Sequence, residues 1–216
     1  MCGRYSLFRI DELMEQYMLH LPEAPPPRYN IAPSQPVLAL IQGPPYRGEW
    51  LQWGLIPNWA RAGFRGLINA RAETVAEKPS FRASFARRRC LIPADGFYEW
   101  SSEDGVKQPY RFALTDRSVF CFAGLWDRWT DPQGHTLQTC TILTTEPNDE
   151  VRSIHNRMPV ILHPEDEARW LDPSQPPSAL SGLLIPYPSG HMEKRSVSKQ
   201  LNSPKNDFPE LLAVQE

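Results

Sequence analysis

The sequence lacks the features that mark a membrane-spanning, exported or disulfide-stabilised protein. No stretch approaches the roughly 18 consecutive apolar residues that a membrane-spanning helix needs, and no basic segment followed by an apolar run begins the chain. The four cysteines, Cys2, Cys90, Cys121 and Cys140, are far apart, and none belongs to a Cys-x-x-Cys pair. We therefore expect a cytoplasmic protein with free thiols, in which Cys90, Cys121 and Cys140 are core residues.

Internal repeats, low-complexity tracts and a linker with a shift in composition are also missing. Of the 216 residues 41% are hydrophobic and 22% charged, close to the average of globular proteins, which excludes a disordered or collagen-like chain. Proline is the outlier, with 23 residues, about twice the usual share. Because proline is excluded from helix interiors and central strands, we expect short elements and many loops. We predict a single domain over 1–210 and a C-terminal tail over 211–216.

Hydrophobic periodicity predicts few, short helices and many strands. An amphipathic helix is expected over 11–19, a basic helix over 73–89 and a late helix after Pro164, from Glu165 to Leu171. Strands are expected over 37–41, 50–55, 97–100, 110–114, 118–125 and 139–145. Hairpin turns are expected at 104–105 and 131–134, and a surface loop over 173–190. This order favours a mixed α+β fold built from antiparallel sheets.

Positive charge is concentrated in residues 61–90. This segment has eight basic residues against two acidic ones, although the whole chain has a net charge of −2. Such asymmetry is typical of a basic face that binds phosphate. A solvated helix surface would give the same pattern, so composition alone leaves both interpretations open.

Cys2 differs from the other cysteines because it follows the first methionine. Loss of Met1 would leave an N-terminal cysteine, whose amine (pKa about 7.7–8.0) and thiol (about 8.5) are both available near neutral pH. Such a vicinal aminothiol condenses with an aldehyde to a five-membered thiazolidine, which no internal cysteine can form. The alternative is that cysteine stands at position 2 by chance.

Three further polar residues are open to a functional and a structural interpretation. Glu99, flanked by aromatic residues on an expected strand, would be a general acid of raised pKa or the partner of an arginine. His155, at a loop junction, would titrate near neutral pH or be structural. Asn69, at the end of an apolar stretch, would orient a substrate or cap the next turn.

Several motifs stand in the order of a known family and span residues 2 to about 202. They are MCGR at 1–4, YNIAP at 29–33, WGLIP at 53–57, NARAET at 69–74, PADGFYEW at 93–100, IHNRMP at 154–159, and Val197-Ser198 with Asn202. Through them the chain resembles the SOS-response-associated peptidase (SRAP) family. Several separate motifs that match the family in the same order are very unlikely to arise by chance.

The resemblance implies the SRAP fold, a single α+β domain of mostly antiparallel, barrel-like sheets flanked by short helices. It implies a protein that binds single-stranded DNA, or a single-to-double-strand junction, with an abasic site. Cys2, after the protein has removed its own Met1, would form a thiazolidine crosslink with the ring-opened deoxyribose, and a weak lyase activity by β-elimination would compete. Asn69 would place the amine, Glu99 would transfer protons, and His155 would contact the opened sugar. No cofactor or metal is implied, and we expect a monomer.

For DNA contacts we expect Arg4 and Arg71, and more weakly Lys78, to bind phosphates. Trp59 is expected to stack against a base beside the lesion. Some relatives have a second aromatic residue at the position of its neighbour Ala60. Its absence here weakens the expectation that Trp59 wedges against the base. Asn30 and Pro33 are expected to shape the pocket. Arg87, Arg88 and Arg89 are expected either to steer DNA from further away or simply to belong to the surface.

Two other classes of function remain open from the sequence. Cys2 could be the N-terminal nucleophile of an amidohydrolase or peptidase, with its own amine as base. The chain could also be a single-stranded-DNA-binding module without a covalent step.

Overall fold

Short strands and shorter helices make up the structure, a computed structural model that describes residues 2–103 and 106–214. The strands are β1 (Tyr5–Leu7), β2 (Arg28–Ile31), β3 (Pro36–Gln42), β4 (Arg47–Trp53), β5 (Asn69–Arg71), β6 (Arg89–Ala94), β7 (Gly96–Glu103), β8 (Val106–Leu114), β9 (Phe120–Thr130), β10 (Thr136–Thr145), β11 (Met158–Pro159) and β12 (Met192–Ser196). The α-helices are α1 (Ile10–Gln16), α2 (Arg82–Arg87), α3 (Asp149–Arg152), α4 (Pro164–Leu171) and α5 (Pro177–Leu180). The short 3-10 helices are η1 (Ala72–Thr74), η2 (Ser181–Leu183), η3 (Ser189–His191), η4 (Lys199–Asn202) and η5 (Pro209–Leu212).

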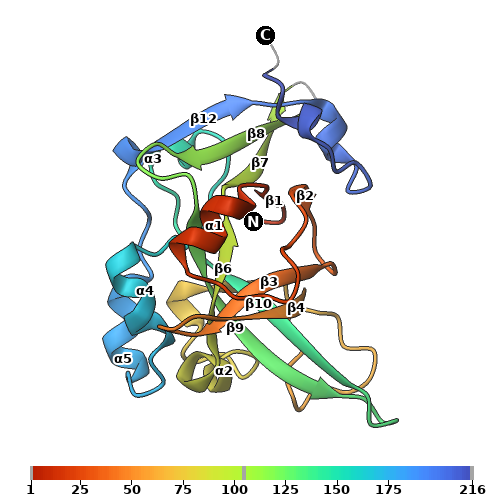
Figure 1. Cartoon of the computed structure of the whole chain (residues 1–216), viewed down its shortest axis with the longest axis vertical. Helices are drawn as coiled ribbons and strands as arrows, with labels where there is room; N and C mark the ends of the chain where they lie inside the picture. The colour runs from red at the N-terminus through yellow and green to blue at the C-terminus, as the bar shows by residue number, and fades with distance from the viewer. Residues whose placement is uncertain (1, 104–105, 215–216) are drawn as a thin grey trace.

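Two sheets lie one above the other in Figure 1. The upper sheet has the strand order β12-β8-β7-β1-β2. The lower sheet runs β11-β10-β4-β3-β6-β9, with β5 beside β10. Because β9 also pairs with β10, the strands β10, β4, β3, β6 and β9 close into a barrel. The predicted fold class is therefore confirmed: an α+β domain of mostly antiparallel, barrel-like sheets with short helices outside.

Parallel strand pairing is confined to β10 and its neighbours β4 and β5, and β5 carries Asn69, one of the expected site residues. Strand β10 runs parallel to both β4 and β5, while every other strand pair in the described ranges is antiparallel. Parallel neighbours require a crossover connection rather than a hairpin. Strands β4 and β5 pair with β10 one after the other, and the segment 54–68 connects them. The crossover to β10 is made by the chain that follows β5, and Asn69 comes to lie opposite Ile142 of β10.

The long β9–β10 hairpin projects beyond the barrel at the lower right of Figure 1. Its predicted turn at 131–134 is confirmed, since the Gly134 amide donates to the Asp131 carbonyl at 3.0 Å. Gly134 has φ +90°, a conformation that favours glycine. The other predicted turn, Asp104-Gly105, lies outside the described residues.

Three predictions of local structure need correction. The basic helix expected over 73–89 is wrong: η1 and a series of turns precede α2, because Pro79 interrupts the segment with a residue that has no amide hydrogen. The helix expected over 11–19 begins and ends earlier, at 10–16. The segment 173–190, expected to be an irregular loop, contains α5, η2 and the start of η3.

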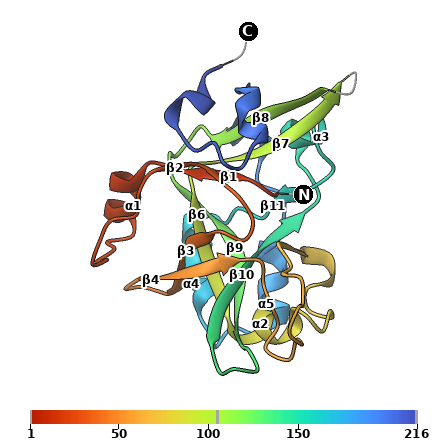
Figure 2. The ribbon, with the colours of Figure 1, turned by 90° about the vertical axis from the view of Figure 1, so that its right-hand side faces the viewer.

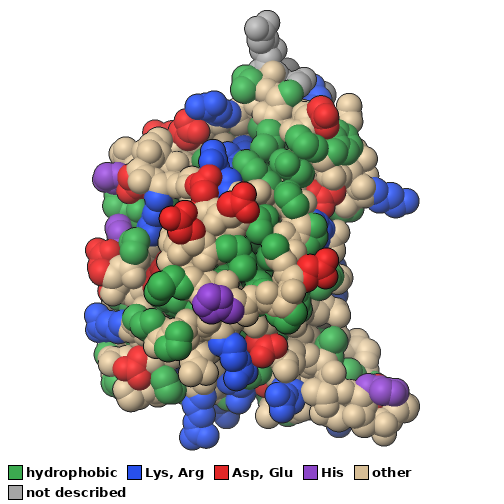
Figure 3. Space-filling model, viewed as in Figure 1, with side chains coloured by type: hydrophobic (Ala, Val, Ile, Leu, Met, Phe, Trp, Pro, Cys, Tyr) green, Lys and Arg blue, Asp and Glu red, His purple; other side chains and the backbone are tan. Residues whose placement is uncertain are grey.

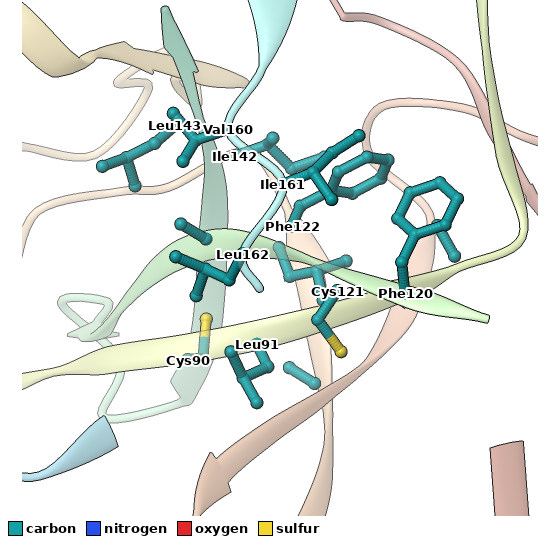
Figure 4. Close-up of a cluster of buried hydrophobic side chains, with 14 of the residues drawn as sticks. Cys90, Leu91, Phe120, Cys121, Phe122, Ile142, Leu143, Val160, Ile161 and Leu162 are labelled. Atoms are coloured by element: carbon teal, nitrogen blue, oxygen red, sulfur yellow. The ribbon is translucent and has the colours of Figure 1, made fainter. Parts of the chain in front are cut away.

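A continuous hydrophobic core fills the barrel and the space beneath the upper sheet. Figure 4 shows part of it, where Phe120 and Phe122 of β9 lie with the apolar side chains of residues 160–162. Cys90, Cys121 and Cys140 are fully buried free thiols within this core, as predicted. None of the helices in the described ranges is long and apolar enough to cross a membrane.

Candidate active site

Strand β1 places the start of the chain beside β7. Tyr5 pairs with Phe97 in an antiparallel register, and the Tyr98 amide donates to the Arg4 carbonyl at 3.0 Å. Continuing this register by two residues sets Gly3 opposite Glu99. Figure 2 shows β1 within the upper sheet, with its first residues on the side where β11 lies and α1 at its other end. The two segments that the sequence singled out for chemistry, around Cys2 and Glu99, therefore lie side by side.

Cys2 has no exposed surface and belongs to the hydrophobic core. Burial raises the pKa of its thiol well above the ordinary value, and the neighbouring Glu99 carboxylate raises it further. The expectation that this thiol ionises near neutral pH without tuning is therefore wrong for the buried side chain. At neutral pH it is a protonated thiol that needs a base to become a nucleophile.

Glu99 is 3% exposed in the middle of β7. Burial raises the pKa of its carboxyl group to about 7, so that both protonation states are populated at neutral pH. Its Oε1 atom lies 3.9 Å from Nδ1 of His155. No arginine in the described part of the chain lies within ion-pair distance of it, so the general-acid interpretation fits the geometry and the arginine-pair interpretation does not.

His155 follows α3 and is held by the backbone that comes after it. The Arg157 amide donates to Nδ1 of His155 at 3.0 Å, and the Arg157 carbonyl oxygen lies 3.1 Å from the same atom. Burial lowers the pKa of the imidazole below its usual value. Near neutral pH the site therefore favours a neutral imidazole beside a carboxyl group that is partly protonated, which is a suitable arrangement for proton transfer.

Asn69 begins β5 and pairs with Ile142 of β10. Its Nδ2 atom donates to the Ile142 carbonyl at 3.4 Å, and its Oδ1 atom is buried without a hydrogen-bond partner among the described residues. That hydrogen bond goes to β10 and the N-cap residue of η1 is Arg71, so the capping alternative is not realised. A buried acceptor of this kind is costly unless a ligand satisfies it, which agrees with a role in orienting a donor such as an amine.

Glu73 and Arg157 were not singled out from the sequence, yet they join the two segments that carry Asn69 and His155. The Nη1 and Nη2 atoms of Arg157 donate to the two oxygens of the Glu73 carboxylate, at 2.7 and 3.0 Å. This paired contact holds the pKa of Glu73 below its usual range. Both residues belong to motifs that mark the family, Glu73 to NARAET and Arg157 to IHNRMP, and this could have drawn attention to them. The sequence does not show that these two motifs lie next to each other in the fold.

The residues expected to contact DNA divide into two groups. Arg71 and Lys78 are exposed, and Trp59 has 58% of its surface exposed, so all three are accessible to a ligand. Phe64 forms an edge-to-face contact with Trp59, with ring centroids 6.2 Å apart, and so supplies a second aromatic ring that Ala60 does not. These residues lie in or near the basic segment, and Figure 3 shows Lys and Arg side chains at the lower edge of the molecule, below the barrel.

Arg4 is already engaged within the protein. Its Nη1 atom donates to Asn30 Oδ1 at 2.7 Å and to the Leu201 carbonyl at 3.0 Å, and its guanidinium lies 5.5 Å from the centroid of the Trp100 ring. Asn30 is fully buried and donates to the Ser203 carbonyl at 3.0 Å. Arg4 and Asn30 thus tie the C-terminal segment to β1 and β2.

Pro33 lines a cavity of about 640 Å³ between β4 and the segment that precedes β5. Asn69 also lines this cavity, and Trp53, Phe64 and Leu67 contribute apolar lining. Asn30 is not among the lining residues. Of the two residues predicted to shape a pocket, Pro33 lines this cavity and Asn30 anchors the backbone instead.

The arginine run at the end of α2 also needs correction. Arg89 is 3% exposed and donates to the carbonyls of Phe85, Ala86 and Trp170, so it fixes α2 and α4 rather than steering DNA. Arg88 lies 3.2 Å from Asp127. Of the three, Arg87 remains as an exposed side chain.

Fold and site together define a mixed α+β barrel protein with a cysteine next to its amino terminus, set beside a buried glutamate and a partly buried histidine. A model of the SOS response associated peptidase (SRAP) family matches residues 1–204, and the chain belongs to this family. It is 49% identical to the protein named abasic site processing protein YoqW of Bacillus subtilis, over 98% of this chain and 99% of that one. It is 32% identical to the abasic site processing protein HMCES of Xenopus tropicalis over 76% of its length, and this match spans 56% of that longer protein.

Solved structures show the same architecture. A crystal structure of a protein from Bacteroides thetaiotaomicron superimposes with a TM-score of 0.88 at 28% identity, covering 100% of both chains. A protein from Bordetella bronchiseptica superimposes with a TM-score of 0.79 at 29% identity, covering 91% of this chain. The recognition of the family from its motifs is therefore confirmed.

Proposed function

We propose that this protein captures abasic sites in single-stranded DNA by a covalent bond to Cys2 after Met1 has been removed. The observation that carries the proposal is the burial of Cys2 against Glu99, with His155 3.9 Å from the Glu99 carboxylate. Relatives named abasic site processing proteins match over nearly the whole chain, which supports an abasic site as the substrate. Removal of Met1 by the protein itself, as the family name suggests, would convert the Cys2 peptide nitrogen to a free amine.

The first chemical step is opening of the sugar. An abasic deoxyribose is mostly a closed hemiacetal, so a proton must reach the ring oxygen while the anomeric hydroxyl loses one. Glu99 with a pKa of about 7 supplies the proton, and neutral His155 accepts the hydroxyl proton, which exposes the aldehyde. The ring C–O bond breaks and the carbonyl π bond forms, with no net change of redox state.

The second step joins the aldehyde to the Cys2 amine. The amine adds to the carbonyl carbon, and a proton moves from nitrogen to oxygen to give the carbinolamine. His155 passes the proton that it took from the sugar to Glu99, whose Oε1 atom lies 3.9 Å from its Nδ1 atom. Glu99 then protonates the carbinolamine hydroxyl, which leaves as water and leaves an iminium ion. The buried thiol then transfers its proton to the Glu99 carboxylate as sulfur attacks the iminium carbon. The product is a thiazolidine, one water is released, and Glu99 regains the proton that it gave. A single carboxyl group can therefore supply and recover the proton, and it serves the reverse reaction equally.

The iminium stage also permits a second outcome. Loss of the proton next to the iminium carbon would eliminate the 3′ phosphate and cleave the strand, which is a weak lyase activity. Attack by the adjacent thiol competes with this elimination because it is intramolecular, and pre-positioned groups react with large effective concentrations. We therefore propose crosslinking as the main activity.

The DNA partner is proposed from the exposed basic and aromatic side chains. Arg71 and Lys78 would bind phosphates, and Trp59 with Phe64 would stack against a base, as in proteins that bind single strands. The protein would act as a monomer, since one chain contains all of the proposed reactive groups.

A denaturing gel tests the proposal. Purified protein is incubated with an oligonucleotide that contains one abasic site, and a heat-stable adduct is expected. Cys2→Ala should abolish the band, whereas Cys90→Ala, which removes another buried thiol, should leave it. Absence of the band with wild-type protein, or its persistence in Cys2→Ala, would contradict the covalent mechanism. If wild-type protein gives no band but still binds the oligonucleotide, the result would favour a module that binds single-stranded DNA without a covalent step.

A further inference from the structure

Glu73 and Arg157 form a contact that ties together two segments 84 residues apart in sequence. Glu73 lies in η1, directly after the strand that carries Asn69 and Arg71. Arg157 lies two residues after His155. The two hydrogen bonds, at 2.7 and 3.0 Å, form the parallel fork that gives Arg–carboxylate contacts their fixed geometry.

The contact spans the end of β10. Thr144 of β10 pairs with Arg71 of β5 on one side and with Pro159 of β11 on the other. The Nη2 atom of Arg157 also donates to the Thr144 carbonyl, at 2.5 Å. The guanidinium is thus fixed by a carboxylate from one neighbouring segment and by the backbone of the strand between them.

Fixing Arg157 also fixes His155. The amide of Arg157 donates to Nδ1 of His155 at 3.0 Å, and that same Nδ1 faces Oε1 of Glu99 at 3.9 Å. If the Arg157 side chain swings away, the amide that orients the imidazole loses its anchor. The positive charge of Arg157 also acts on His155, since it lowers the pKa of the imidazole.

We infer that Glu73 is a positioning residue for the abasic-site reaction, which acts by holding Arg157 and through it the imidazole of His155. The inference rests on the proposed function. It assigns Glu73 no contact with DNA: its carboxylate is committed to Arg157 and its negative charge disfavours a phosphate.

A purely stabilising role is a poor alternative explanation. The Glu73 side chain is 50% exposed, and ion pairs with an exposed partner contribute little to the free energy of folding. Loss of the carboxylate should therefore leave the fold intact while it releases Arg157 and His155. A small displacement of a catalytic group is enough to slow a reaction strongly.

The test compares Glu73→Gln with Glu77→Gln. Glu77 lies four residues further along the same segment and is exposed, and it forms no ion pair among the described residues. Glu77→Gln therefore makes the same change of charge but leaves the contact between Glu73 and Arg157 intact. Affinity is measured with an oligonucleotide that carries a tetrahydrofuran analogue, which cannot form an aldehyde. The rate of adduct formation is then measured at saturating abasic DNA, as a function of pH.

We expect Glu73→Gln to slow adduct formation by about tenfold or more at saturating DNA. The affinity for the analogue should change by less than about twofold, because an exposed charge that does not touch the DNA contributes little to binding. The limb of the pH–rate profile that reports His155 should move to higher pH, because burial and the positive charge of Arg157 both lower the pKa of the imidazole and both effects weaken when Arg157 and His155 are released. Glu77→Gln should match the wild type in rate, affinity and pH profile. The melting temperature of both variants should stay close to that of the wild type.

An unchanged rate and pH profile in Glu73→Gln would overturn the inference, as would an equal loss in Glu77→Gln or a loss confined to affinity. The wild-type reaction separates this failure from the failure of the proposed function. If wild-type protein forms no adduct, the proposed function falls and the positioning role with it; if only Glu73→Gln behaves as wild type, the positioning role alone falls.

Discussion

The imidazole of His155 lies 3.9 Å from the carboxylate of Glu99, and burial moves the two pKa values in opposite directions. Burial raises the pKa of Glu99 to about 7 and lowers that of His155. Both shifts favour the neutral forms, a carboxylic acid and a neutral imidazole. The pair is therefore prepared to donate one proton and accept another at neutral pH without prior rearrangement.

Glu99→Gln should slow formation and reversal of the crosslink together. Glutamine occupies the same space but cannot transfer a proton, and general acid–base catalysis contributes roughly 10²–10⁴-fold. Single-turnover gels followed in both directions measure the two rates. Equal rates in wild type and variant would remove Glu99 from the mechanism.

The stability of the protein should fall as the pH rises through neutrality, because a second carboxyl group, Glu167 of α4, is also buried. Burial raises its pKa to about 7, and its Oε1 atom accepts a hydrogen bond from the Tyr17 hydroxyl at 2.9 Å. The folded state thus binds the proton more tightly than the unfolded chain, whose glutamates titrate near 4.3. The stabilisation is full below that pH and is lost as the pH rises through about 7.

Glu167→Gln isolates this effect because it keeps an acceptor for Tyr17 and removes the titration. We expect the free energy of unfolding of the wild type to decline by up to about 3 kcal/mol between pH 5 and pH 8 from this group, and the variant to decline less. Urea unfolding at a series of pH values measures it. Parallel profiles for the two proteins would show that Glu167 does not titrate in this range.

Arg71→Glu should weaken DNA binding, and more at low than at high salt. An exposed arginine that neutralises a phosphate releases counterions, so its loss reduces the slope of log affinity against log salt by about one. Fluorescence anisotropy with single-stranded DNA measures the slope. Arg47→Glu, at an exposed position on β4, serves as the control. A defect in Arg71→Glu that is independent of salt would point to misfolding instead.

Trp59→Ala should lower affinity for single-stranded DNA by roughly 5-fold to 100-fold, the range expected when one base loses its aromatic stacking partner. The chain offers a matched control in Trp50, which is exposed to a similar degree, 51% against 58%. Trp50→Ala should bind as the wild type. Equal losses in the two variants would argue against a specific wedge at Trp59.

The reacting groups could be chosen from the sequence because each stands in a short motif with its own chemistry, as Cys2 and Glu99 do. Their meeting could not be derived, because it depends on the pairing of β1 with β7 and on the parallel pairing of β5 with β10, which are contacts between distant segments. For the same reason the partnership of Glu73 with Arg157 was missed.

Local errors had local causes. Pro79 stands within an otherwise helix-compatible segment and limits the basic helix to α2. Charged residues are mostly exposed, so the sequence favours a surface position for Arg89; in the structure its guanidinium satisfies backbone carbonyls at the ends of α2 and α4. The boundary of the domain at residue 210 remains a prediction.

The central claim is that a free aminothiol at the mature amino terminus bonds to the abasic sugar. Intact-mass spectrometry of the wild-type protein, incubated with an oligonucleotide containing one abasic site, measures this directly. We expect an adduct whose mass is that of the chain without Met1, plus the oligonucleotide, minus one water. An adduct that retains Met1, or one whose attachment maps to a residue other than Cys2, would contradict the account.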